Sequence, residues 1–363
     1  MSNNYCVIMA GGVGARFWPL SRTSRPKQFI DILGVGKSLI QLTIDRFVNI
    51  CPIENIYIVT NEIYYNLVKE QLPQLSDEQI ILEPMRRNTA PCIAYANEKI
   101  KKRCPDANII VAPSDHVIIN ETSFVEHIKA ALDCAEHNPW LLTLGIKPVR
   151  PDTGYGYIQY DEKQTYAPER RISKVKIFTE KPQLELAKQF LESGDFLWNA
   201  GIFVWKLSTI EAAFKQYLPE VYELFEACSY KIGTEGEKEA INQTYQRCPS
   251  ISVDYGIMEK AVNVHVLASD FGWSDLGTWG SLYEQLKHDT NNNAIQAPYD
   301  VFTYDTKDCI ISTPKNKVVV IQGLKDYIVS ESDNTLLICR KEDEQQIRQF
   351  VNDVQLQKGD KYI

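Results

Sequence analysis

An apolar run followed at once by a glycine-rich, basic segment lies near the start of this chain. Residues 5–10 are almost wholly apolar and predict a buried first strand. Three glycines follow within four residues, at Gly11, Gly12 and Gly14, and Arg16 and Lys27 come after them. Glycines allow positive φ and let backbone N–H groups converge on phosphate oxygens, and the two cations add positive charge. Because nucleotides bind at such strand-to-loop junctions in α/β proteins, the segment predicts a site for a nucleoside triphosphate.

Two familiar phosphate loops do not fit this segment. The dinucleotide fingerprint G-x-G-x-x-G requires a third glycine where this chain has Phe17. The Walker loop requires a glycine where Asp31 stands, although Gly-Lys-Ser at 36–38 matches its end. The broken fingerprint disfavours a nicotinamide-dependent dehydrogenase. An ordinary tight turn is the alternative interpretation of the glycines, and the positive charges that follow them favour the phosphate site.

Strands and helices are expected to alternate through the first two-thirds of the chain. Strands are predicted at residues 5–10, 55–60, 80–82, 108–112, 141–146, 175–179, 202–206 and 264–267. Helices are predicted at residues 62–71, 89–103, 123–137, 184–192 and 207–216. This order favours an α/β fold, with a Rossmann-like, mostly parallel sheet flanked by helices on both faces. Sites in such folds form at the carboxyl ends of strands, where Gly11, Asp115, Lys181 and Asp275 are expected.

A polar run at residues 289–293 indicates a linker between two parts of the chain. We therefore predict a catalytic domain at residues 1–290 and a small β appendage at residues 291–363. Short runs at 301–304, 309–312, 317–322, 326–330 and 335–340 predict its strands, and a helix is expected near 342–353. The preferred interpretation of this appendage is a capping subdomain without chemistry, with a role in the contacts of a homodimer.

Composition narrows the classes of partner. The formal charge of −8 over 363 residues argues against general binding of nucleic acid or of an anionic membrane surface. No apolar stretch approaches membrane-spanning length, and the first residues do not resemble a signal peptide, so a cytoplasmic location is expected. Nine cysteines without a C-x-x-C pair predict reduced core thiols rather than disulfides or a metal cluster.

The segment at residues 11–29 resembles the pattern G-G-x-G-x-R-[FL]-W-P-L-S-R-x-x-x-P-K-Q-F of the sugar nucleotidylyltransferases, and specifically of the mannose-1-phosphate guanylyltransferases. Further motifs follow in the order of that family: E-P at 83–84, R-N-T-A-P at 87–91, P-S-D-H at 113–116, T-G-Y-G-Y-I at 153–158, E-K-P at 180–182, W-N-A-G-I-F at 198–203, S-V-D-Y-G-I-M-E-K at 252–260 and W-S-D-L-G-T-W at 273–279. The resemblance covers residues 5–290 well and the remainder more loosely.

The resemblance implies an activity and an architecture. It implies that GMP passes from GTP to α-D-mannose 1-phosphate with Mg²⁺, giving GDP-mannose and pyrophosphate by direct in-line attack. It also implies a left-handed β-helix-like C-terminal end. Alternatives are a nucleotidylyltransferase for another sugar phosphate or nucleotide, and a non-catalytic, ligand-sensing homologue of the same fold.

The candidate site residues fall into four groups. The residues expected to act in catalysis are Arg16, Lys27 and Lys181. The residues expected to bind the nucleotide are Ala10, Gly11, Gly12, Gly14, Glu83, Asn88 and Thr89. The residues expected to bind the sugar are Gly156, Glu180, Asn199 and Asp254. Asp115 and Asp275 are the expected metal ligands. The resemblance assigns the two metal positions, and likewise Lys181, Glu180 and Asn199.

Each of these residues also has a plainer interpretation. Asp115 and Asp275 could be loop or cap aspartates, Glu180 and Lys181 a solvated charge pair, Asn199 a turn residue and Asp254 a helix cap. Arg16, Lys27 and Asp115 are expected to be exposed when the site is empty. His116 has a structural or a chemical role.

Glu83 is the expected reader of the nucleotide base. It ends a predicted strand, so a carboxylate there could accept the N1–H and N2 amino donors of guanine. Adenine offers no donor at N1, and an unpaired, desolvated carboxylate is costly. The alternative is an ion pair between Glu83 and Arg86 or Arg87.

Overall fold

The computed structural model describes residues 3–166, 171–296, 300–314 and 316–363. Tertiary contacts divide the chain into two compact units. Unit 1 comprises the chain up to Gly11 together with Ile44–Ser114 and Ile118–Trp273, and unit 2 comprises Gly12–Thr43, Asp115–Val117 and Ser274–Ile363. Residues 12–43 thus group with the C-terminal segment. The linear division at residue 290 stays a prediction.

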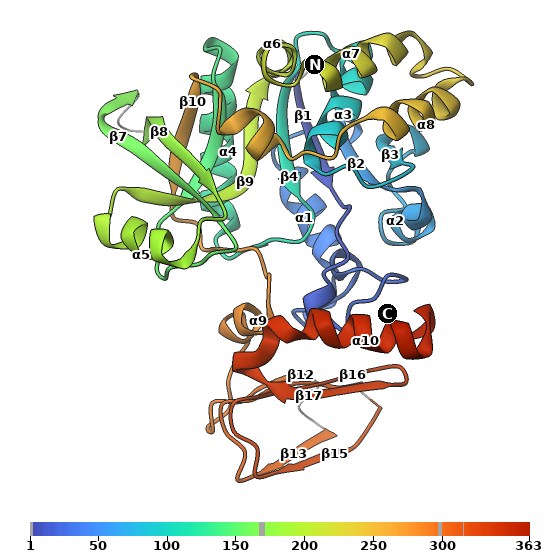
Figure 1. The fold of residues 1–363 in the computed structure, drawn as a ribbon, viewed down its shortest axis with the longest axis vertical. Coiled ribbons are helices and arrows are strands. Elements are labelled where there is room, and N and C mark those ends of the chain that lie inside the picture. The colour runs from blue at the N-terminus through green and yellow to red at the C-terminus, as the bar shows by residue number, and fades with distance from the viewer. Residues whose placement is uncertain (1–2, 167–170, 297–299, 315) are drawn as a thin grey trace. The chain divides into compact units, whose positions relative to one another are not determined.

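Unit 1 contains a nine-stranded sheet flanked by helices, with the order β3-β2-β1-β4-β9-β6-β10-β8-β7. Its strands are β1 Asn4–Met9, β2 Ile56–Asn61, β3 Ile80–Glu83, β4 Asn108–Pro113, β6 Leu141–Ile146, β7 Gly156–Tyr166, β8 Ile172–Glu180, β9 Phe196–Lys206 and β10 Val264–Ser269. Figure 1 shows β2 and β3 (blue) at one edge of this sheet and β7 and β8 (green) at the other. The predicted α/β, Rossmann-like class is confirmed.

The sheet is mixed rather than mostly parallel. Strands β3, β2, β1 and β4 are parallel, as predicted. β9, however, is antiparallel to both neighbours, β4 and β6, and β7 forms an antiparallel pair with β8. β9 also begins at Phe196, six residues before the predicted strand. Gly201 has a φ of 65° inside β9, so the motif that looked like a turn is part of the strand.

Helices cover both faces of the sheet. The helices of unit 1 are α2 Tyr65–Gln71, α3 Thr89–Arg103, α4 Glu121–His137, α5 Leu184–Ser193, α6 Leu207–Tyr217, α7 Pro219–Cys228 and α8 Glu237–Arg247, and the residues of α1 Leu39–Phe47 are divided between the two units. Tyr5 and Val7 of β1 pack in one core with α3, α6, α7 and α8. Cys6 and Ile8 point to the opposite face and are fully buried as well. The helices α7 and α8 were not predicted.

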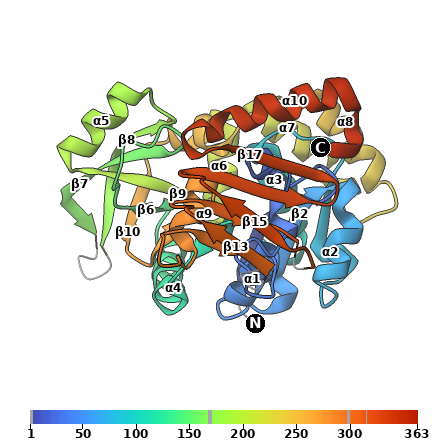
Figure 2. The ribbon, with the colours of Figure 1, turned by 90° about the horizontal axis from the view of Figure 1, so that it is seen from below.

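Unit 2 contains a stack of short parallel strands. β12 Ala294–Gln296, β14 Ile310–Ser312 and β16 Tyr327–Ser332 pair in parallel, and β13 Val301–Tyr304 pairs in parallel with β15 Val319–Gln322. Figure 2 shows β13 beside β15. β17 Thr335–Arg340 ends the stack as an antiparallel neighbour of β16. Such parallel stacking is typical of a β-helix, and its hand stays a prediction.

Helix α10, Ile347–Lys358, covers the four-stranded sheet of unit 2. Buried Ile347 packs in one core with Ala294, Ile310 and Ile328 from the stacked strands. The same core contains Phe17 and Trp279, whose ring centroids lie 5.4 Å apart. Trp279 begins the short helix α9, Trp279–Gln285. In Figure 1, α10 (red) runs along the strands of this unit. A 3₁₀ helix at Lys341–Gln346 leads directly into α10, so the predicted helix near 342–353 lies within a helical segment that continues to Lys358.

Two further predictions concern the whole chain. Within the described ranges, none of the helices has the length and apolar character needed to cross a membrane. All nine cysteines are free thiols, and seven of them are buried. The prediction of reduced core thiols agrees with this arrangement.

Candidate active site

The glycine-rich loop of unit 2 presents unused backbone donors. The carbonyl oxygens of Gly12, Val13 and Gly14 accept hydrogen bonds from Gln28 Nε2 (2.9 Å), the Lys27 amide (3.1 Å) and Ser21 Oγ (2.5 Å) respectively. Within the described residues, the N–H groups of residues 12–15 donate no hydrogen bond. A run of free N–H groups in a glycine-rich turn is a favourable site for an anion.

Gly14 is a position where only glycine fits. Its φ is 72°, in the left-handed region that favours glycine. A Cβ atom on Gly14 would lie 2.5 Å from Cβ of Lys27, and it would collide with that side chain. Gly14 therefore allows the loop to turn directly over Lys27.

Lys27 connects three other residues of unit 2 through its ammonium group. Its ammonium donates to the carbonyl oxygens of Asp275 and Leu276, each at 2.9 Å, and pairs with Asp115 Oδ2 at 2.7 Å. The residue is only 4% exposed, and Arg16 and Asp115 are partly buried. The expectation that these three groups are exposed is therefore wrong. The reason is that the segment 275–277 supplies backbone acceptors that hold both cations.

A cavity of about 240 Å³ in unit 2 brings the predicted phosphate and metal residues together. Its lining includes Arg16, Lys27, Asp115, Asp275 and the loop residue Gly14. Arg16 Nη1 donates to the Gly277 carbonyl oxygen at 3.3 Å, and Asp275 Oδ1 accepts from the Gly277 amide at 2.9 Å. The cavity thus combines cations, carboxylates and free N–H groups.

The charge of Asp115 is stabilised by its neighbours. Burial acts to raise the pKa of Asp115, but the Lys27 ammonium and His116 lower it, and the net pKa lies below the usual range. His116 also lines the cavity, so it is placed for an electrostatic role there. Asp115 therefore stays a carboxylate at neutral pH.

The two carboxylates in the cavity suit a divalent cation. Mg²⁺ prefers oxygen ligands and usually keeps several water or phosphate oxygens around it, so two carboxylates are enough. Among the described residues no three His, Cys, Asp or Glu side chains gather into a complete metal cluster. Asp115 and Asp275 suit an ion whose other ligands come with the substrate.

Glu83 of unit 1 is buried at the carboxyl end of β3, the edge strand. Tyr245 Oη donates to Glu83 Oε1 at 2.9 Å, and Tyr245 itself is fully buried. The second oxygen, Oε2, faces Gly11, where a Cβ atom would lie 3.9 Å away. Burial raises the pKa of Glu83 to about 7, against smaller lowering effects of Tyr245 and Arg86. One carboxyl oxygen is therefore held by the protein and one faces the start of the loop.

The alternative ion pair of Glu83 with an arginine does not form in the described residues. Arg86 Nη2 donates to Tyr64 Oη at 3.3 Å, and Arg87 Nε donates to the Tyr245 carbonyl oxygen at 2.9 Å. Arg87 therefore anchors the segment that carries Tyr245 and does not neutralise the Glu83 carboxyl.

The other predicted nucleotide residues of unit 1 have partners within the chain. Asn88 has a φ of 67° and caps its own helix α3 by accepting from the Thr89 amide at 2.9 Å. Thr89 Oγ1 accepts from the Val253 amide at 2.9 Å. The Ala10 carbonyl oxygen accepts from Thr60 Oγ1 at 2.8 Å. Asn88 and Thr89 thus fix the backbone that follows Glu83.

The predicted sugar residues form one cluster in unit 1. Lys181 Nζ donates to Glu180 Oε1 at 2.5 Å, and Asn199 Nδ2 donates to Asp254 Oδ1 at 2.9 Å. A Cβ atom on Gly156 would lie 2.4 Å from Glu180 Oε2, so glycine leaves room for this carboxylate in its present position. The structure brings these five residues together. Asn199 lies inside β9, but its Oδ1 also accepts from the Gly201 amide at 3.1 Å, as the turn interpretation expects. The cap interpretation of Asp254 does not hold, because Val253 is the N-cap of the helical turn Asp254–Met258.

The charges of this cluster interact strongly. Burial and the neighbouring Glu180 raise the pKa of Asp254 to about 7, although Lys181 and Asn199 oppose this. Burial acts to lower the pKa of Lys181, but Glu180 and Asp254 raise it above the usual value. Two carboxyl groups beside one lysine and one amide can offer acceptors and donors to vicinal hydroxyl groups.

Three residues of these sites were missed in the sequence. Thr143 Oγ1 donates to Asn199 Oδ1 at 2.9 Å and thereby fixes which side of the amide faces Asp254. Tyr245 orients Glu83, and Arg348 lines the cavity of unit 2. Thr143 lies in an apolar strand, and Tyr245 lies in a polar helix that contains no motif. Arg348 lies in the C-terminal segment that was interpreted as a capping subdomain without chemistry.

Comparisons with known proteins agree with these features. The family model described as nucleotidyl transferase matches residues 5–292, and one described as a mannose-phosphate isomerase/GMP-like β-helix domain matches residues 300–354. A mannose-1-phosphate guanylyltransferase of Salmonella montevideo is 35% identical over 363 residues, covering 98% of this chain and 75% of the relative. One of Escherichia coli K12 is 34% identical over 358 residues, covering 97% and 74%.

A solved structure shows the same fold over almost the whole chain. A protein of Thermus thermophilus, described as a mannose-1-phosphate geranyltransferase, superimposes with a TM-score of 0.86 at 28% identity and covers 97% of this chain and 99% of its own. The family-model match spans most of the chain, and the curated relatives exceed 30% identity over nearly all of it. The chain belongs to the nucleotidyl transferase family of enzymes, within its mannose-1-phosphate guanylyltransferase group.

Proposed function

We propose that this protein transfers GMP from GTP to α-D-mannose 1-phosphate and releases GDP-mannose and pyrophosphate. The cavity of unit 2 carries this proposal, because it combines free loop N–H groups with Arg16, Lys27 and two aspartates. Such a set suits a polyphosphate and a divalent cation. The names of the relatives supply the sugar and the base. A cytoplasmic location and a homodimer stay predictions from the sequence.

The reaction needs little proton chemistry from the protein. A phosphate oxygen of the sugar phosphate is already anionic and attacks the α-phosphorus of GTP in line. The new P–O bond forms as the bond between the α-phosphorus and the α,β-bridging oxygen breaks, and that oxygen leaves with its electron pair on pyrophosphate. Because one phosphoanhydride replaces another, the step is readily reversible.

The work of the protein is to position two polyanions and to offset their repulsion. Arg16, Lys27 and the N–H groups of residues 12–15 bind the phosphates of the nucleotide. A magnesium ion held by Asp115 and Asp275 would add positive charge at these phosphates when bound. Lys181 binds the phosphate of the sugar, and Glu180, Asn199 and Asp254 bind its hydroxyl groups beside Gly156.

The proposed function is tested by the release of pyrophosphate over a panel of nucleotides and sugar 1-phosphates. We expect turnover with GTP and mannose 1-phosphate, dependent on Mg²⁺, and none when either substrate is omitted. Turnover of GTP alone at the same rate, or none with any sugar phosphate, would contradict a transferase. Faster turnover of another pair of nucleotide and sugar 1-phosphate would support the same class of reaction but assign a different substrate specificity.

Glu83→Gln is expected to weaken the preference for GTP. The structure revises the picture of two carboxylate oxygens on guanine, because Oε1 already accepts from Tyr245 and only Oε2 faces Gly11. Glutamine keeps an acceptor for Tyr245 and loses the charge. A hydrogen bond to a charged group contributes about 1.5–3 kcal/mol, so KM for GTP should rise about ten- to hundredfold, with a smaller change for ATP and dTTP.

Glu98→Gln is the matched control for this measurement. Glu98 is another buried glutamate of unit 1, only 8% exposed, and its pKa is also raised, mainly by burial. This variant should leave nucleotide preference unchanged. If the relative kcat/KM values of Glu83→Gln for the three nucleotides equal those of the wild type, the base is read elsewhere, by Asn88, Thr89 or the loop backbone.

A further inference from the structure

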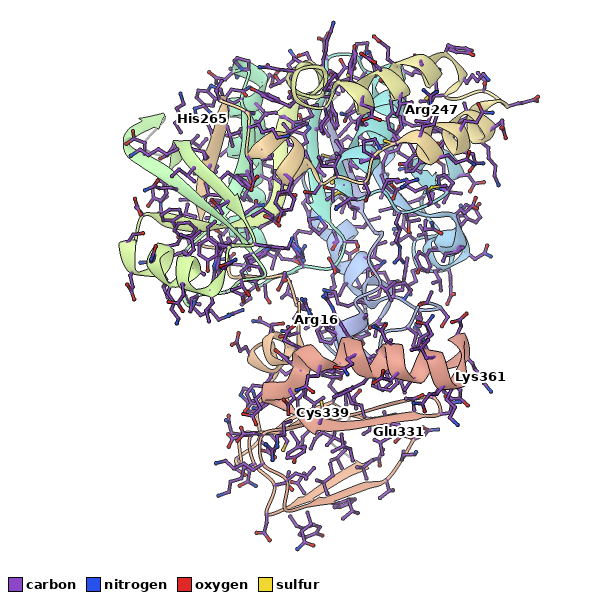
Figure 3. The ribbon with its side chains drawn as sticks, viewed as in Figure 1. Arg16, Arg247, His265, Glu331, Cys339 and Lys361 are labelled. Carbon is purple, nitrogen blue, oxygen red and sulfur yellow. The ribbon has the colours of Figure 1, made fainter. Side chains whose placement is uncertain are left out.

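Arg348, the second residue of helix α10, lines the cavity that also contains Arg16, Lys27, Asp115 and Asp275. All of these residues belong to unit 2. The preceding residue, Ile347, is fully buried in the core with Phe17 and Trp279. The start of α10 is thereby fixed against the short helical turn Ala15–Phe17 that carries Arg16. Figure 3 shows Arg16 beside the start of this helix.

The guanidinium of Arg348 is available to a ligand, in contrast to the other two cations. Lys27 is paired with Asp115 and donates to two carbonyl oxygens, and Arg16 donates to Gly277. Within the described part of the chain, Arg348 makes no hydrogen bond and no ion pair, and its side chain is exposed.

The charged side chains of the cavity do not by themselves neutralise a polyphosphate, so a further cation there is favourable. Lys27 forms an ion pair with Asp115, and the cavity lining also contains Arg16 and Asp275, so these four side chains together carry no net formal charge. A nucleoside triphosphate brings three or more negative charges, and one divalent ion offsets only part of them. An arginine fork suits phosphate oxygens because it can donate two parallel hydrogen bonds.

We propose that Arg348 binds the β- and γ-phosphates of the nucleotide and the pyrophosphate that they become; this inference rests on the proposed function. Lys27 is buried at the inner wall of the cavity, whereas Arg348 is exposed, so Arg348 meets the phosphates that must leave. The C-terminal segment therefore contributes to the reaction and is more than the cap that the sequence suggested.

Arg348→Gln tests this inference, with Lys358→Gln as its control. Lys358 is an exposed cation at the other end of α10, so its variant removes the same charge from the same helix. Binding of inorganic pyrophosphate with Mg²⁺ is measured by calorimetry. The KM values for pyrophosphate and for GDP-mannose are measured in the reverse reaction. Neither substitution touches the core, so both variants should melt like the wild type.

We expect Arg348→Gln to weaken pyrophosphate binding, and to raise KM for pyrophosphate, about tenfold or more. KM for GDP-mannose should change less than about twofold, because this substrate lacks the phosphates that Arg348 binds. Lys358→Gln should match the wild type. Equal weakening of both substrates, or wild-type binding of pyrophosphate by Arg348→Gln, would overturn the inference.

Failure of this inference and failure of the proposed function are distinguishable. A wild-type protein that turns over no nucleotide with any sugar phosphate contradicts the proposed function. An active wild type with an unaffected Arg348→Gln variant contradicts only the role of Arg348. Calorimetry needs no turnover, so it decides whether Arg348 binds pyrophosphate in either case.

Discussion

Lys27→Met should lower kcat about 10²–10³-fold, the cost of removing one preorganised group that meets developing charge. Methionine keeps most of the length of the side chain beneath Gly14 but removes the charge and the donors. The effect on kcat should include more than the missing positive charge, because the ammonium also holds the Asp275 and Leu276 carbonyl oxygens and Asp115 in place. The same substitution should therefore move the carboxylates that we assign to the metal.

Lys27→Met should also lower stability, by about 1–3 kcal/mol, because a partly buried carboxylate and two carbonyl oxygens lose their donor. Lys27 holds the pKa of Asp115 below its usual range, so this stabilisation is present above the ordinary aspartate pKa of about 3.9 and is lost as the pH falls through the lowered pKa. The difference in Tm between wild type and variant should shrink on acidification. A difference in Tm that does not change with pH would show that the effect of Lys27 on stability does not depend on the charge of Asp115.

The double variant Lys27→Met/Asp115→Asn separates activity from stability. Neutralising Asp115 removes the unpaired charge, so part of the lost Tm should return at neutral pH. Activity should not return, because both assigned groups are then missing. Wild-type kcat/KM in Lys27→Met alone would show that Lys27 has only a structural role.

Asp275→Asn should lower kcat about 10²–10³-fold at a fixed low Mg²⁺ concentration. Asparagine keeps an Oδ1 atom that can accept from the Gly277 amide, a bond of 2.9 Å in the structure, so the turn should survive. The substitution removes the negative charge of the carboxylate that we propose as a ligand of Mg²⁺. The measurement is the rate as a function of Mg²⁺, and half-activation should move to a higher concentration.

Asp308→Asn is a suitable control for the metal prediction. Asp308 lies in unit 2 outside the cavity, and its Oδ1 accepts from Asn292 Nδ2 at 2.7 Å. The same change of charge should leave the Mg²⁺ dependence unaltered there. If Asp275→Asn shows the Mg²⁺ dependence of the wild type, Asp275 is not a ligand and acts only on its turn.

The sequence predicted those parts of the site that lie in short, contiguous motifs. The loop at 11–29 has the predicted free N–H groups and basic residues, and the motif residues Glu180, Asn199 and Asp254 do gather in one cluster. Its alternation of strands and helices also predicted the class of fold. These features are local, so neighbouring residues are enough to indicate them.

The rest depends on contacts between distant segments. The burial of Lys27 follows from backbone acceptors at 275–276, which no local pattern places beside residue 27. Tyr245 reaches Glu83 across 162 residues of sequence, from a helix with few apolar residues. β9 runs antiparallel to β4 and β6, and it continues through Gly201, whose φ is 65° and where sequence alone suggests a turn.

The proposed function requires that GMP be transferred onto a phosphate oxygen of mannose 1-phosphate. An isotope-labelling experiment tests this directly. Mannose 1-phosphate labelled with ¹⁸O at its non-bridging phosphate oxygens is incubated with GTP, Mg²⁺ and the wild-type protein, and the masses of the products are measured by mass spectrometry. Such a transfer predicts GDP-mannose that retains the whole label and pyrophosphate that carries none. Label in pyrophosphate, or no GDP-mannose at all, would contradict the account.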